Sequence, residues 1–159
     1  MKKVILFMVF FFCSTGFLNL VGQSKEDDQI TYEKLYEQIL QSGIKFPEVV
    51  FAQAVLETGH FQSKLFKEAN NLFGMKVPGV RETLAIGRRK GNYAVFENWM
   101  SSVNDYQLWQ TYVLRNKVIT TQKEYLSLLN RIYSTNKKYV VSLKTIISRS
   151  QHIFNKTVS

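Results

Sequence analysis

The chain has 159 residues, which fits a single domain, and its 45% hydrophobic and 21% charged residues exclude wholesale disorder and collagen-like repetition. Its one cysteine, Cys13, excludes a disulfide framework within the chain and a zinc site built from several cysteines. A net charge of +9 indicates a polyanionic partner: nucleic acid, an anionic membrane surface or an acidic cell-wall polymer.

The first 22 residues have the pattern of a secretory signal peptide. Lys2 and Lys3 precede an apolar run that starts at Val4, and small residues such as Gly22 suit a cleavage site. The alternative is an uncleaved anchor, but the 18 residues at 4–21 include polar interruptions and fall just short of a bilayer span. We therefore expect residues 1–22 to be removed and residues 23–159 to form one domain.

Export narrows the choice of partner. Once the signal peptide is cleaved the chain has no thiol, and an exported protein meets no intracellular nucleic acid. The basic charge then points to a polymer of the periplasm, the cell envelope or the extracellular wall. We expect no nucleic-acid partner, no stable membrane span after cleavage, no cofactor, and a monomeric chain.

The first half of the mature chain predicts three helices and a loop. Apolar side chains recur at helical spacing over Ile30–Leu40, and Pro47 opens a second helix that runs to about Glu57. A short helix follows over Ser63–Ala69. The stretch 78–96 is rich in glycine and basic residues, and it predicts a loop or a small hairpin.

The second half predicts three more helices. Asn98 is a good N-cap, and apolar residues continue at helical spacing from there to Val113. Thr121 and Glu124 form a capping box that opens the next helix. A single last helix is expected over roughly Lys138–Phe154. The mature chain is therefore predicted to be one mainly α domain with a short loop or β-hairpin region in the middle.

Glu57 is the residue best suited to acid chemistry. It ends an apolar helix, with Val55 and Leu56 before it and Phe61 shortly after it. Apolar surroundings disfavour a charged carboxylate, so the pKa of Glu57 should lie above its ordinary value. A carboxyl group that is still protonated near neutral pH can donate a proton to a leaving oxygen. The alternative is a surface glutamate at a helix end, and this segment alone does not decide between the two.

Four segments, in order, resemble the bacterial glucosaminidase domain, glycoside hydrolase family 73, which includes many autolysins. The first is Ala-Gln-Ala-Val-Leu-Glu-Thr-Gly at 52–59, and the second is Asn-Asn-Leu-Phe-Gly-Met-Lys at 70–76. The third lies at 93–106 and contains Asp-Tyr at its end, and the fourth is Tyr-Ser-Thr-Asn-Lys-Lys-Tyr at 133–139. The resemblance spans about residues 30–154.

The resemblance implies a lysozyme-like, two-lobed fold with the substrate groove between the lobes. The implied activity is that of a peptidoglycan hydrolase, an endo-β-N-acetylglucosaminidase that cleaves the β-1,4 bond after N-acetylglucosamine. It implies that Glu57 is the general acid and that Tyr133 assists near the reacting sugar. It also implies that Asn71 and Phe73 shape the wall of the groove and contact substrate.

A second catalytic carboxylate is harder to assign. Many family members carry one in a hairpin after the second motif, and here that region offers only Glu82. Glu82 is equally suited to a loop salt bridge with Arg81, which contributes little if it is exposed. The acetamido group of the substrate can replace one carboxylate, so Glu57 alone would suffice. Retention or inversion at the anomeric carbon therefore stays open.

Other residues suggest sugar contacts more weakly. Tyr93 falls outside the helical stripe of Trp99 and Trp109, so it is the better candidate to stack on a sugar, while the two tryptophans are expected in the core.

His60 and His152, with acidic residues only scattered around them in the sequence, do not make a metal site.

Two other functions stay open on the sequence. A lytic transglycosylase would use the same fold and one glutamate but would close a 1,6-anhydro ring instead of adding water. A non-catalytic wall-binding or assembly module would keep the groove without turnover. The chemistry of the products separates the first alternative, and binding to sacculi without loss of turbidity would identify the second.

Overall fold

The computed structural model describes residues 29–133, 136 and 138–158. The expected signal peptide lies outside the described residues, as do Ser134, Thr135 and Lys137 of the fourth motif. No helix within the described ranges is long and apolar enough to cross a membrane.

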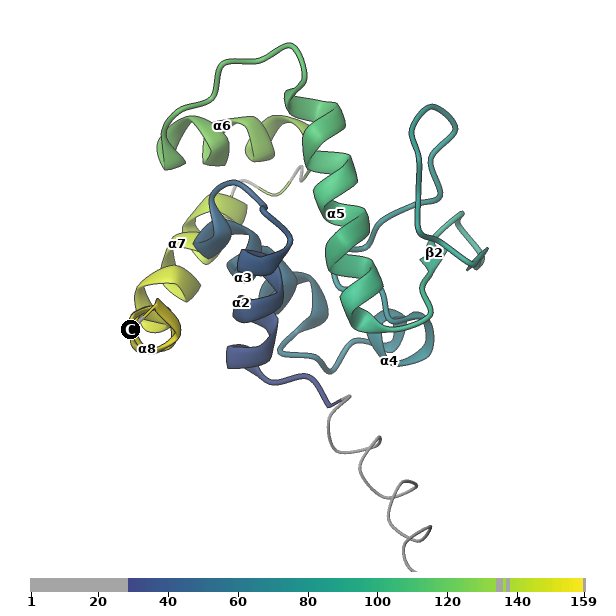
Figure 1. Cartoon of the computed structure of the whole chain (residues 1–159), viewed down its shortest axis with the longest axis horizontal. Coiled ribbons are helices and arrows are strands. Elements are labelled where there is room, and N and C mark those ends of the chain that lie inside the picture. The colour runs from purple at the N-terminus through teal and green to yellow at the C-terminus, as the bar shows by residue number, and fades with distance from the viewer. Residues whose placement is uncertain (1–28, 134–135, 137, 159) are drawn as a thin grey trace, which may run out of the picture.

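Helices dominate the described chain, and a two-stranded sheet interrupts them in the middle (Figure 1). The helices are α2 (Tyr32–Gln41), α3 (Pro47–Thr58), α4 (Lys64–Ala69), α5 (Trp99–Leu114), α6 (Gln122–Ile132), α7 (Tyr139–Arg149) and α8 (Gln151–Val158). Strands β1 (Gly87–Arg88) and β2 (Ala94–Val95) pair antiparallel, with Gly87 opposite Val95. The predicted mainly α architecture with a central hairpin is confirmed.

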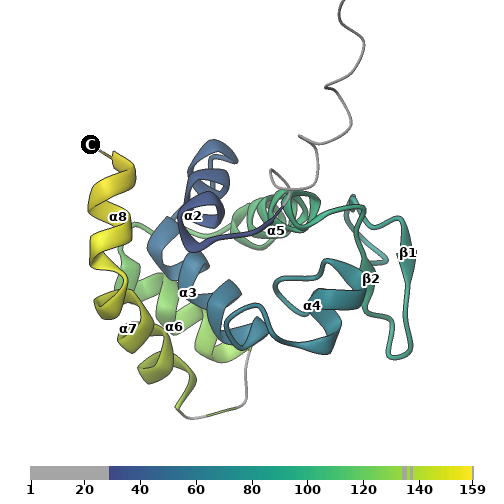
Figure 2. The ribbon, with the colours of Figure 1, turned by 90° about the horizontal axis from the view of Figure 1, so that it is seen from below.

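The elements form two lobes that meet along α5 (Figures 1 and 2). Helices α2, α3, α6, α7 and α8 make the larger lobe, while α4 and the β1–β2 hairpin lie on the other side of α5, as the view from below shows most clearly. Residues 70–97 connect α4 to α5, and they carry the second motif and the hairpin.

Helix α3 is the centre of the larger lobe. It packs against α2 and α7, and it is buried on almost every side, at Val49, Val50, Phe51, Ala52, Gln53, Ala54, Val55 and Thr58. A helix that is apolar all round belongs in a core, and here neighbouring helices supply the partners. The carboxyl end of this rigid element carries Glu57.

The predicted helix starts agree with the structure. The side chain of Asn98 accepts a hydrogen bond from the Ser101 amide at 2.8 Å, so it caps α5 as expected. Both halves of the predicted capping box of α6 are present, with the Glu124 amide 3.2 Å from Thr121 Oγ1 and the Thr121 amide 3.0 Å from Glu124 Oε2. These caps depend on local sequence, which is why they could be predicted.

The predicted single helix over Lys138–Phe154 is wrong. The chain breaks at Ser150 into α7 and α8, and Ser150 itself is buried. The break lets α8 fold back so that the ring of Phe154 lies 4.6 Å from that of Tyr36 and 5.3 Å from that of Phe51, centroid to centroid. Packing against α2 and α3, which the helical spacing does not reveal, decides where the helix ends.

Candidate active site

Glu57 lies in the last turn of α3 and is exposed to solvent. Protein atoms nevertheless surround its carboxyl group enough that burial raises its pKa above the ordinary value, while a hydrogen bond with Tyr139 acts in the opposite direction. The predicted direction of the pKa shift is therefore confirmed. Glu57 combines access from solvent with a proton that is held more firmly than in a free glutamate.

A sharp turn follows Glu57 at once. Gly59, His60 and Phe61 are all left-handed, with φ of 54°, 58° and 67°, which is a costly conformation for the two residues that are not glycine. Thr58 supports the turn, because its buried hydroxyl accepts a hydrogen bond from the Phe61 amide at 3.0 Å. His60 Nδ1 lies 2.7 Å from the hydroxyl of Tyr32. The turn ends α3 and leaves Glu57 at an open helix end.

Tyr133 and Tyr139 lie beside Glu57. The rings of the two tyrosines are stacked, with centroids 6.2 Å apart. The rings of Trp109 and Tyr133 form a T-shaped pair, with centroids 5.6 Å apart. Burial, and then the nearby Glu57 carboxylate, raise the pKa of both phenols well above their ordinary value. The structure thus brings together Glu57 and Tyr133, the two residues that the resemblance singled out as acting on the sugar.

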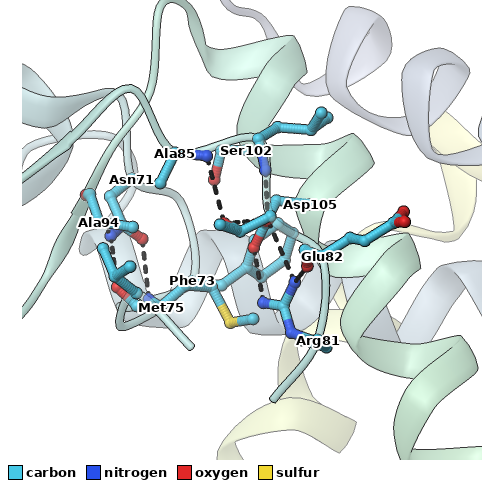
Figure 3. A network of polar contacts seen from close by, with 12 residues as sticks. Asn71, Phe73, Met75, Arg81, Glu82, Ala85, Ala94, Ser102 and Asp105 are labelled. Atoms are coloured by element: carbon cyan, nitrogen blue, oxygen red, sulfur yellow. Dashed lines mark hydrogen bonds and ion pairs between the residues drawn. The ribbon is translucent and has the colours of Figure 1, made fainter. Parts of the chain in front are cut away.

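The second motif forms a turn that Asn71 holds from inside. Its Nδ2 donates to the carbonyls of Met75 and Ala94, both at 2.8 Å, and its Oδ1 accepts from the Met75 amide at 2.9 Å (Figure 3). The Leu72 amide donates to the buried hydroxyl of Ser102 on α5 at 3.0 Å. The turn is therefore attached to both β2 and α5.

Asn71 and Phe73 do not lie where the sequence suggested. Each side chain is only 1% exposed, and the Phe73 ring packs 4.3 Å from that of Tyr106. Direct contact with a sugar does not fit this burial, because both side chains point into the protein. Phe73 reaches the site through its backbone instead, since its carbonyl accepts a hydrogen bond from the Tyr133 hydroxyl.

The segment that carries Glu82 is attached to α5 by Asp105. Both carboxylate oxygens of Asp105 accept from Arg81, at 3.2 and 2.7 Å, in an ion pair whose side chains are 6% and 0% exposed. Asp105 Oδ1 also accepts from Thr83 Oγ1 at 2.7 Å and from the Leu84 amide at 2.9 Å. A carboxylate with all these donors is a structural anchor.

Arg81 does not form the loop salt bridge with Glu82 that the sequence left open as one of two roles for Glu82. Arg81 bonds only the backbone carbonyl of Glu82, at 2.6 Å, and the Glu82 side chain extends away from it (Figure 3). Arg81 instead pairs with Asp105, because a buried guanidinium requires a buried partner, and an exposed neighbour in sequence does not provide one. Glu82 is exposed on the surface of this anchored segment.

Tyr93 belongs to the hairpin region. It is bridged to Lys76, whose Nζ lies 5.7 Å from the centre of the Tyr93 ring. A Cβ atom at Gly91 would come within 3.1 Å of this ring, so the ring lies closely against the backbone there. Tyr93 is half-buried, and its contact with a sugar stays a prediction.

The two tryptophans differ in their surroundings. Trp99 is buried in the core as expected. Trp109 is only half-buried, and with Tyr112 and Ile132 it lines a surface hollow of about 340 Å³. Because Trp109 also pairs with Tyr133, this hollow lies next to the site. Helical spacing alone could not distinguish this half-buried position of Trp109 from a core position.

Gln53 is a site residue that sequence reasoning missed. It is completely buried one turn before Glu57, and its Nε2 donates to the Tyr139 hydroxyl at 3.0 Å. It lies within the first motif, whose pattern does not indicate a chemical role for it. A polar side chain amid the apolar residues of 49–55 was the available signal, because a buried amide requires partners.

Acidic residues and histidines do not gather into a metal centre in the part of the chain that the structure describes. No group of three or more histidine, cysteine, aspartate or glutamate residues there could hold a metal ion.

Comparison with known proteins gives a family match and a structural match. The model of the glucosaminidase family, described as mannosyl-glycoprotein endo-beta-N-acetylglucosaminidase, matches residues 33–152. The crystal structure of the catalytic domain of the autolysin Auto from Listeria monocytogenes is similar, with a TM-score of 0.54 and 23% identity over 84% of this chain and 96% of that chain. This likeness confirms the expected lysozyme-like fold. No curated protein sequence matches the chain.

Proposed function

The chain belongs to the glucosaminidase family of glycoside hydrolases, and from this membership we propose that it cleaves the glycan strands of peptidoglycan. The proposed bond is the β-1,4 linkage after N-acetylglucosamine, cut within the strand. The net charge is +9 for the whole chain and +7 once Lys2 and Lys3 are removed with the signal peptide, and it supports an anionic polymer as the substrate.

The observation that carries this proposal is the position of Glu57. Its carboxyl group is reachable from solvent, its pKa is raised by burial, and two tyrosines that keep their protons lie beside it. We propose that Glu57 gives its proton to the glycosidic oxygen as the bond to the anomeric carbon breaks. Water then adds its hydroxyl group to that carbon, and its remaining proton restores the acid.

Tyr133 is proposed to act as a neutral hydrogen-bonding group. Burial keeps its pKa well above the ordinary value, so the phenol does not serve as a base at physiological pH. Its proton is directed to the Phe73 carbonyl, which leaves the lone pairs of the phenol oxygen to accept from a substrate amide or a water. This role fits the assistance that the resemblance implies.

Two groups compete for the role of second carboxylate. Glu82 is exposed on a segment that Asp105 holds firmly, and the acetamido group of the substrate is the alternative. Asn71 and Phe73 are proposed to support this side of the groove from behind, and Tyr93 and Trp109 to offer aromatic surface to sugar rings.

The proposed enzyme works outside the cytoplasm as a monomer. The apolar start of the chain supports export with cleavage near residue 22, and the basic charge suits a wall polymer. The envelope, including the periplasm where one exists, is the proposed location.

Product analysis tests the proposal directly. Purified peptidoglycan is digested with the protein, and the fragments are identified by mass spectrometry. New reducing N-acetylglucosamine ends are expected. Ends of 1,6-anhydro-muramic acid would instead identify a lytic transglycosylase. Retention on sacculi with no new ends would identify a wall-binding module and overturn the proposed hydrolysis.

A further inference from the structure

A chain of hydrogen bonds runs through the core of the larger lobe and ends at Tyr139, which lies beside Glu57. It links side chains from α5, α6, α3 and α7, all of which are buried. In order from the far end, its members are Gln110, Tyr125, Tyr106, Gln53 and Tyr139. Buried polar groups need hydrogen-bond partners, but this need alone does not decide which partner donates the proton in each bond.

The far end has a fixed direction because it is bonded to a peptide. The Lys45 amide donates to Gln110 Oε1 at 2.8 Å, and Gln110 Nε2 donates to the Lys45 carbonyl at 2.9 Å. A backbone N–H can only donate and a carbonyl can only accept, so the Gln110 amide has one possible orientation. Its Nε2 therefore also donates to the Tyr125 hydroxyl, 2.9 Å away.

Each tyrosine hydroxyl in the series accepts one hydrogen bond and donates its own proton to the next acceptor. Tyr125 accepts from Gln110, and the Tyr106 oxygen, 2.7 Å away, is its other hydrogen-bond partner in the structure, so we assign the single proton of Tyr125 to that oxygen. Tyr106 then accepts from Tyr125, and its own proton goes to Gln53 Oε1. Burial raises the pKa of Tyr125 to about 12 and that of Tyr106 well above its ordinary value, so these protons stay in place.

At the near end, the hydroxyl proton of Tyr139 is left to face the acid. With its oxygen facing Tyr106, Gln53 turns its Nε2 to the Tyr139 hydroxyl, at 3.0 Å. Tyr139 accepts there, so its own proton is left to point toward the neighbouring Glu57 carboxyl group, one turn from Gln53 on α3. Gln53 and Glu57 are one turn apart on α3, so both lie on the face that meets α7.

We propose that the Lys45 peptide, acting through Gln110, sets the donor-to-acceptor direction of every hydrogen bond in this series, so that Tyr139 donates a hydrogen bond to the carboxylate of Glu57. The proposal rests on the proposed role of Glu57 as the acid, and it makes Gln110 a remote positioning residue. Donation to a carboxylate favours its charged form and opposes the effect of burial. A reversed chain would point the Tyr139 proton to Gln53, and Glu57 would then hold its own proton more tightly.

Few other titratable groups described in the structure face α3. Those from neighbouring elements, with their partners, are Tyr133 at the end of α6, and Tyr32 and Tyr36 on α2, which bond His60 and Glu48. None of these belongs to the chain of hydrogen bonds from Gln110 to Tyr139.

Titration of Glu57 in two variants tests the proposal. Tyr139→Phe removes the final donor, and Gln110→Glu replaces the donor at the far end with an acceptor, which favours the reversed direction. The pKa of Glu57 is read from its ¹³C carboxyl resonance in the intact protein, assigned through Glu57→Gln. We expect a rise of about one pH unit in each variant. Tyr36→Phe, which removes a buried phenol that bonds the carboxylate of Glu48, should leave the Glu57 titration unchanged.

A folded Gln110→Glu variant with the wild-type Glu57 titration would overturn the proposal. If that variant does not fold, neutron diffraction from the deuterated wild-type protein decides instead. The deuteron of Tyr139 is expected on the side of Glu57, and a deuteron facing Gln53 would refute the assigned direction. Neither measurement uses substrate. An absence of hydrolysis would therefore count against the proposed function and not against the proposed direction of the hydrogen bonds.

Discussion

The hydroxyl of Tyr133 donates a hydrogen bond to the backbone carbonyl of Phe73, joining the end of α6 to the turn of the second motif 60 residues earlier. The two segments belong to different parts of the fold, and Glu57 lies beside Tyr133. This contact therefore couples the geometry of the proposed acid to the turn that Asn71 braces.

Glu57→Gln is expected to lower peptidoglycan hydrolysis by about 10²–10⁴-fold, the usual contribution of a general acid. The amide keeps the shape of the side chain but has no acidic proton to give. Release of soluble muropeptides measures the loss, and circular dichroism checks the fold. Glu48→Gln, on the same helix, is the matched control and should keep activity. Wild-type release from Glu57→Gln would end the proposed mechanism.

The pH dependence should follow the raised pKa of Glu57. Activity needs the protonated acid, so kcat/KM should fall as pH rises through a value above the ordinary pKa of about 4.3. The folded state also binds this proton more tightly than the unfolded state. Relative to Glu57→Gln, the wild type should therefore lose stability as pH rises from the ordinary pKa through the raised one. Equilibrium unfolding at several pH values measures this, and parallel curves would contradict it.

Glu82→Gln separates the two candidates for the second carboxylate. If the substrate acetamido group serves, the variant should keep activity within a few-fold of the wild type, because no step passes through Glu82. If Glu82 is the second carboxylate, the loss should approach that of Glu57→Gln, and added azide should restore part of it. The anomeric form of the first product, followed by NMR, distinguishes retention from inversion independently.

Tyr133→Phe removes the hydrogen bond to the Phe73 carbonyl but keeps the ring that packs against Trp109 and Tyr139. The expected loss of stability is about 1 kcal/mol, since one buried acceptor loses its donor. The fall in kcat should exceed the rise in KM if the phenol oxygen orients a group at the reacting sugar. An unchanged kcat with normal stability would remove Tyr133 from the site.

Asp105→Asn should be the most destabilising of these changes. It leaves Arg81 buried without its counter-charge, a defect that costs about 3–5 kcal/mol. Urea denaturation measures the loss, and Arg81→Met added to Asp105→Asn should recover part of it. The control is Glu68→Gln, which removes the half-exposed pair with Arg89 and should cost less than about 1 kcal/mol. Equal effects of the two variants would refute the anchoring role of Asp105.

The amino-acid sequence alone determined the features that depend on neighbours along the chain. Asn98 and the Thr121–Glu124 box start their helices as predicted, because a cap is a contact between residues three positions apart. The direction of the Glu57 pKa shift also followed from its place at the end of an apolar helix, although the burial that raises the pKa comes from the folded structure. The order of four motifs was enough to indicate the family.

Tertiary structure decided everything that joins distant segments. Arg81 forms its ion pair with Asp105 and not with its sequence neighbour Glu82. The helix ends at Ser150, and α8 then packs Phe154 against α2 and α3. The chain of hydrogen bonds from Lys45 to Tyr139 joins side chains of four helices, and no local pattern predicts it. A buried polar or aromatic group takes whichever partner the fold brings within reach, and that partner is set by how helices pack, which the spacing of residues within one helix does not encode.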